Sequence, residues 1–132
     1  MKPGAYAGDI GYAIQSCAEK NGYAVVRNFC GSGIGRELHC EPQILNFGRP
    51  GTGKAIVAGM AFSICPIINA GGNGIRELTD GFSIVTKDHG LSAQWKHVVL
   101  ATAGGVEVLT CSGNDNSIEA SFRKIVELEK FE

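Results

Sequence analysis

The chain has 132 residues, of which 44% are hydrophobic and 19% charged, and its formal net charge is -1. This length and composition favour a single folded domain with a packed core and exclude a disordered chain. Acidic and basic residues are balanced, so the sequence has no excess of positive charge that would bind nucleic acid or an anionic membrane. Neither partner is therefore expected. No apolar run is long enough to span a bilayer, and the N-terminal sequence does not resemble a signal peptide. Five widely spaced cysteines are typical of a reducing cytoplasm, where we place the protein.

The first half of the chain is predicted to begin with a helix. Apolar residues recur at helical spacing from Ile10 to Ala18, and Asn21-Gly22 predicts where the helix ends. A strand is expected at 23–29, a short apolar segment at 44–47 and a loop at 48–53. The long apolar run at 59–69 is typical of a strand buried on both faces.

The second half is predicted to contain more strands and a final helix. Strands are expected at 75–78, 82–86 and 92–100, and Gly104-Gly105 between two apolar runs predicts a hairpin. An apolar stripe then predicts a helix at about 116–130. The order helix, antiparallel strands, helix indicates an α+β fold, in one domain over residues 1–132.

Two glycine-rich runs are candidates for binding loops. Residues 30–35 alternate glycine with small residues, which suits a ligand, a closely packed neighbouring strand, or a simple turn. Residues 48–54 match the start of a phosphate-binding loop. Ala55 stands where that loop needs a hydroxyl, and the next stretch is a poor helix, so we do not expect nucleotide binding.

Several blocks of the chain together resemble the type I methionine aminopeptidases. The run Cys-Gly-Ser-Gly-Ile-Gly is similar to their Cys-Gly-His-Gly-Ile-Gly, and His-Cys-Glu-Pro is similar to their His-Glu-Glu-Pro. Further on, Gly-Met-Ala-Phe-Ser-Ile-Cys-Pro resembles their Gly-Met-x-Phe-Thr-Ile-Glu-Pro, and Leu-Ser-Ala-Gln-Trp-Lys-His resembles their Leu-Ser-Ala-Gln-Tyr/Trp-Glu-His. These blocks lie at residues 30–35, 39–42, 59–66 and 91–97.

The resemblance implies the C-terminal half of a pita-bread domain, a curved antiparallel sheet with helices on one side. It also implies metal-dependent removal of an N-terminal methionine, with two divalent cations held by two Asp from the other half and by a His and two Glu from this one. Ser32 stands at the His position, Cys65 at the first Glu position and Lys96 at the second. His39 matches the substrate-contacting His of the family.

These departures predict a half-domain, degenerate or engineered, with no catalytic residue and no cofactor. In the family the two halves pack face to face, so a single half would expose an apolar inner face. We therefore expect a homodimer in which a second copy covers that face. The alternative is a working methionine aminopeptidase, or a fragment of one that needs its other half. Two lesser alternatives stay open: a single zinc on Cys65, His39 and His97, with Cys40 a less suitable fourth ligand, and a nucleophilic pair of Cys65 with His39.

Overall fold

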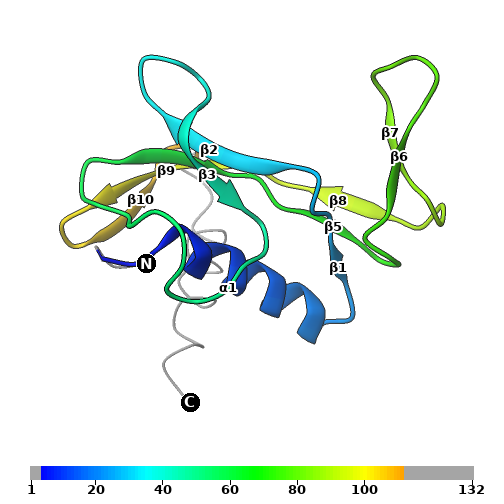
Figure 1. Ribbon diagram of the computed structural model, residues 1–132, viewed down its shortest axis with the longest axis horizontal. Coiled ribbons are helices and arrows are strands. Elements are labelled where there is room, and N and C mark those ends of the chain that lie inside the picture. The colour runs from blue at the N-terminus through cyan, green and yellow to red at the C-terminus, as the bar shows by residue number, and fades with distance from the viewer. Residues whose placement is uncertain (1–3, 112–132) are drawn as a thin grey trace.

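The computed structural model describes residues 4–111, and the helix predicted at 116–130 lies outside them. Within the described part, one helix, α1 (Ala7–Lys20), is followed by strands in three antiparallel sheets (Figure 1). Figure 1 shows α1 lying along one face of the largest sheet, whose other face is open within this part of the chain. The α+β arrangement predicted from the sequence is therefore confirmed for these residues.

Hydrogen bonds at both ends fix the limits of α1. At its start, Asp9 Oδ2 accepts a hydrogen bond from the Tyr6 N–H at 2.6 Å, so a carboxylate sits near the positive end of the helix. At its end, the Asn21 side chain donates to the Cys17 carbonyl at 2.8 Å, and Gly22 takes a positive φ of 78°. The predicted helix and its predicted stop at Asn21-Gly22 are both confirmed.

The largest sheet has the strand order β10-β9-β4-β2-β3, all antiparallel. Its strands run as follows: β2 Cys30–Ile34, β3 Cys40–Leu45, β4 Ala61–Ile64, β9 His97–Thr102 and β10 Gly105–Val108. The turn between β9 and β10 is the hairpin predicted at Gly104-Gly105. The face of this sheet that meets α1 carries the core, with the buried side chains Ala7, Ile10, Ile44, Ile56, Phe62, Ile64, Val99 and Ala101.

A second sheet, β1-β5-β8, continues the first one. It consists of β1 Ala24–Val25, β5 Ile67–Asn69 and β8 Ser92–Gln94. The β5–β8 pairing keeps the register of the β4–β9 pairing, from Ala61 opposite Leu100 to Asn69 opposite Ser92. The two pairs therefore form one long ladder, interrupted where Pro66 lacks the N–H that a regular ladder needs.

A two-stranded arm, β6 Ile75–Glu77 with β7 Ile84–Thr86, projects from the rest of the structure (Figure 1). Its turn is held by the Asp80 carboxylate, which accepts hydrogen bonds from the N–H groups of Phe82 and Ser83 and from the Ser83 hydroxyl. The Phe82 side chain at this turn is 88% exposed.

Several predicted strand limits were wrong. The strand expected at 23–29 is only Ala24–Val25, and of the apolar segment at 44–47 only the first two residues belong to β3, as its end. The run 59–69 is two strands, not one, and Ile67 and Ile68 are only half-buried rather than covered on both faces. The strand expected at 92–100 is likewise divided at Trp95-Lys96, and β7 begins at Ile84 rather than at residue 82.

Candidate functional site

The glycine-rich run at residues 30–35 forms strand β2, and its glycines allow neighbouring backbones to approach closely. A side chain at Gly31 would collide with the Ser63 carbonyl on β4, and one at Gly33 would collide with the Glu41 carbonyl on β3. Of the three interpretations left open, the structure supports a tightly packed neighbouring strand. Gly31 and Gly33 are buried, and the alternation of a strand turns Ser32 between them to the other face.

Ser32 is the first of the singled-out residues, and the structure joins it to His39. The Ser32 Oγ and the His39 Nδ1 lie 3.1 Å apart, although the two residues are seven positions apart in sequence. The Ser32 N–H donates to the Ser63 hydroxyl at 3.0 Å, which links β2 to β4 through a side chain. His39 therefore pairs with Ser32, and the described hydrogen bonds do not join it to Cys65 as a nucleophilic pair would require.

Cys65 lies in the gap between β4 and β5, and the shared register places it opposite Lys96. The backbone N–H of Trp95 donates to the Pro66 carbonyl at 3.2 Å, so the two strands stay hydrogen-bonded at this point. The Gln94 side-chain amide donates to the Cys65 sulfur at 3.2 Å. Side chains of Gln94, Trp95 and Lys96 line a shallow surface depression here.

His97 faces the opposite side of the sheet from Lys96. It pairs with Ile64, is only 4% exposed, and belongs to the buried set of β9 together with Val99 and Ala101. Strand alternation explains this placement, since adjacent residues point to opposite faces. Cys65, His39 and His97 are therefore not gathered into one site, and residues 4–111 hold no group of three or more His, Cys, Asp or Glu placed to bind a metal.

Both ring nitrogens of His97 have partners that the sequence did not reveal. The Trp95 indole N–H donates to Nε2 at 2.7 Å, and the two rings meet edge to face with centroids 5.9 Å apart. Because an indole nitrogen can only donate, Nε2 must be unprotonated and the proton must lie on Nδ1, 2.9 Å from the Thr110 hydroxyl. The Thr110 hydroxyl also accepts the Val98 N–H. No sequence signal predicts this pairing, because Thr110 is thirteen residues away.

The second glycine-rich loop, at residues 48–54, holds the start of α1 in place. The carbonyls of Thr52 and Lys54 accept the N–H groups of Gly8 and Ala7, each at 2.9 Å. The Asp9 Oδ1 accepts the Gly51 N–H at 2.7 Å. This loop thus presents carbonyl oxygens to the helix start, and it donates the Gly51 amide to a carboxylate of the helix itself. A phosphate would instead require a cradle of free amides.

Comparison with known proteins shows which family the chain belongs to. The model of metallopeptidase family M24 matches residues 1–103, and the chain belongs to that family. Its sequence is 50% identical over 113 residues to the methionine aminopeptidase of Rickettsia prowazekii, covering 85% of this chain and 44% of the relative. It is 44% identical over 115 residues to the methionine aminopeptidase of Escherichia coli, covering 87% of this chain and 44% of that one.

Solved structures agree with the sequence relatives. The crystal structure of the Rickettsia prowazekii methionine aminopeptidase superposes with a TM-score of 0.80 at 50% identity, covering 83% of this chain and 45% of that one. The Thermotoga maritima methionine aminopeptidase superposes with a TM-score of 0.82 at 40% identity, covering 85% and 45%. The described fold is therefore part of the pita-bread fold, and the chain spans less than half the length of the relatives it matches. Among the described residues, no helix combines the length and the apolar character that crossing a bilayer demands.

Proposed function

We propose that this chain corresponds to the C-terminal half of a methionine aminopeptidase and that it does not hydrolyse peptides. The observation that carries the proposal is the chemistry at the three positions that match the family's ligands. They hold a hydroxyl at Ser32, a thiol at Cys65 and an ammonium group at Lys96.

These three groups do not fit a pair of divalent cations. Carboxylates are what bridge and hold two such ions, and none of the three positions provides one. The Ser32 hydroxyl is engaged with His39, and the Cys65 sulfur accepts a hydrogen bond from Gln94. Lys96, directly opposite Cys65 in the ladder, puts a positive charge where a carboxylate would neutralise the metals. We therefore assign no hydrolytic step to these residues.

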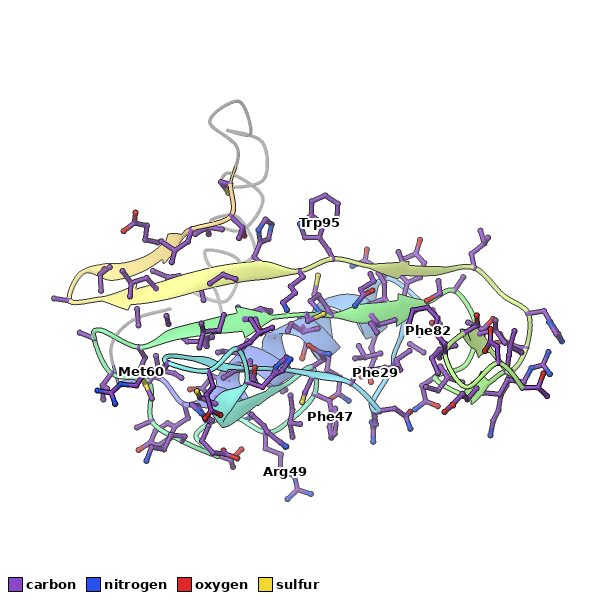
Figure 2. All side chains as sticks on the ribbon, turned by 90° about the horizontal axis from the view of Figure 1, so that it is seen from above. Phe29, Phe47, Arg49, Met60, Phe82 and Trp95 are labelled. Carbon is purple, nitrogen blue, oxygen red and sulfur yellow. The ribbon has the colours of Figure 1, made fainter. Side chains whose placement is uncertain are left out.

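We further propose that the chain self-associates through the sheet face opposite α1. Its relatives are about twice as long, and this face is bare within the described part of the chain (Figure 1). Trp95 stands out from the strands in Figure 2, but its contact with His97 assigns it to the side opposite Lys96, so it is not part of the proposed interface. Leu38, which adjoins the His39 that contacts Ser32, is 66% exposed. A second copy, related by a two-fold axis, would cover Leu38 and the open face around it.

The first experiment measures methionine release from a short Met-peptide by the purified chain supplied with divalent metal. We expect no release that a chelator can abolish. The control is the triple variant Ser32→His, Cys65→Glu, Lys96→Glu, which should bind metal by elemental analysis but release at most a trace of methionine, because two Asp ligands are still missing. Chelator-sensitive release by the unmodified chain would overturn the proposal.

The alternative is that the chain is a fragment that becomes active when it is joined by its other half, and a mixing experiment tests it. The N-terminal half of a bacterial methionine aminopeptidase is expressed separately and mixed with this chain. Activity that appears only in the mixture would favour the alternative. We expect none, because added Asp ligands cannot compensate for the ammonium group of Lys96.

A further inference from the structure

Three adjacent strands bring two cysteines and a lysine into one row. The continuous β4–β5 and β8–β9 ladder places Cys65 opposite Lys96. On the other side of β4, strand β2 is aligned with Gly33 opposite Phe62. Cys30 lies three residues before Gly33 on β2, and Cys65 lies three residues after Phe62, so the two cysteines lie at the same end of this pair of strands.

Hydrogen bonds keep β2 beside β4 up to the level of the cysteines. Ser32 donates its N–H to the Ser63 hydroxyl at 3.0 Å, and that hydroxyl donates to the Ser32 carbonyl at 3.4 Å. The ladder is irregular here, because the Ser63 hydroxyl, rather than a backbone group of β4, forms the hydrogen bonds to Ser32. One buried amide then spans both strands, since the Asn46 Nδ2 donates to the Phe29 carbonyl at 3.1 Å and to the Cys65 carbonyl at 2.9 Å.

Both sulfurs belong to the same face of the sheet. Gly31 and Ile64, the neighbours of the two cysteines, are buried. Strand alternation therefore turns Cys30 and Cys65 to the open face, where Cys30 is exposed and Cys65 half-buried. The Asn46 amide, bound to the carbonyls of Phe29 and Cys65, holds the backbone next to Cys30 close to Cys65. A disulfide requires Cα atoms about 4.4–6.8 Å apart, and we infer that this approach brings the two cysteines within that range.

We propose that Cys30 and Cys65 form a redox-active thiol pair that closes to an intramolecular disulfide by exchange with a small anionic disulfide such as oxidised glutathione. One protein thiolate attacks a glutathione sulfur, forms a mixed disulfide and releases one glutathione thiolate. The second protein thiolate attacks the protein-bound sulfur and releases the other glutathione. The two cysteines are oxidised, the glutathione disulfide is reduced to two thiols, and Lys96 attracts the anionic reagent. This proposal does not depend on the chain being catalytically silent.

The experiment treats the reduced full-length chain with oxidised glutathione, quenches with acid, alkylates the remaining thiols and maps the peptides by mass spectrometry. We expect a Cys30–Cys65 cross-link in the monomeric band of a non-reducing gel. In Cys30→Ser and Cys65→Ser the remaining cysteine should stop at the mixed glutathione disulfide. The matched control, Cys17→Ser on α1, should still form the cross-link.

Lys96 has a separate readout. Lys96→Gln should slow cross-linking by oxidised glutathione several-fold and leave the rate with uncharged hydroxyethyl disulfide unchanged, because only the anionic reagent is attracted. Equal slowing with both reagents would remove Lys96 from the proposal. Persistent mixed disulfides on both cysteines of the unmodified chain, or a bridge to another cysteine, would overturn the thiol pair itself.

A dilution series separates this proposal from the proposed dimer, which would cover the same face. Cross-linking that is fast in dilute protein and slow in concentrated protein supports the thiol pair and a dimer together. Cross-linking at one rate in a chain that stays monomeric supports the thiol pair and overturns the dimer. No cross-link at any concentration overturns the thiol pair alone.

Discussion

At the scale of single residues, the close approach of β2 to β4 depends on a missing side chain. Gly31→Ala would drive a Cβ into the backbone carbonyl of Ser63, with the Ile44 Cβ also in contact, so there is little room to move. We expect a loss of about 1–3 kcal/mol in the free energy of unfolding, the usual cost of overpacking. Urea denaturation measures it. Gly104→Ala is the matched control, because nothing lies within 4 Å of its added Cβ. Equal stability of the two variants would contradict the packing described for β2.

Asp80 gives the arm a pH dependence of known sign. The Ser83 hydroxyl, then the backbone N–H groups of Ser83 and Phe82, lower the pKa of this carboxyl from 3.8 to about 2. Because the folded pKa lies below the unfolded one, the stabilisation is present above about pH 4 and is lost as the pH falls toward 2. An NMR titration of the Asp80 carboxyl carbon should give a midpoint near pH 2, and Ser83→Ala should move it upward. A midpoint near 4 in the unmodified chain would mean that the turn is open in solution.

At the scale of elements, β4 is the strand on which the core depends. Phe62 is 1% exposed and packs among the residues of β9 and α1, whereas Phe82 on the arm is 88% exposed. We expect Phe62→Ala to lose about 3–5 kcal/mol of stability. Phe82→Ala should change stability by less than about 0.5 kcal/mol. Thermal unfolding of both variants tests the contrast, and a large loss in Phe82→Ala would show that the arm packs against something.

The elements also show what periodicity and turn chemistry could predict. The limits of α1 and the hairpin at Gly104-Gly105 follow from local signals, and both are confirmed. The division of the run 59–69 needed Pro66 to be weighed against its apolar neighbours, since a proline cannot donate to a ladder. The β2 strand was missed as a strand because glycine has low strand propensity, and here tertiary packing overrides it.

The site was only partly predictable for a similar reason. The sequence grouped His97 with Cys65 and His39 as candidate zinc ligands, but strand alternation turns His97 to the buried face. The partners Trp95 and Thr110, which fix the His97 tautomer, depend on distances that no spacing rule contains. The Ser32–His39 contact likewise arises from a turn between β2 and β3. Family resemblance suggested which positions to compare, and only the fold shows which side chains meet.

At the scale of the whole molecule, the sheet face opposite α1 is open, and we propose that a second copy of the chain covers it. Measuring the oligomeric state tests this directly. We expect a dimer by light scattering at about tens of micromolar, dissociating on dilution as mass action requires. Leu38→Glu places a charge on the proposed interface, and two-fold symmetry introduces it twice, so this variant should be largely monomeric. Tyr12→Glu is the control, because Tyr12 is 43% exposed on α1, which covers the opposite face (Figure 1). A parent chain that is monomeric at every concentration, or a Tyr12→Glu variant that dissociates as readily as Leu38→Glu, would contradict an interface on the open face.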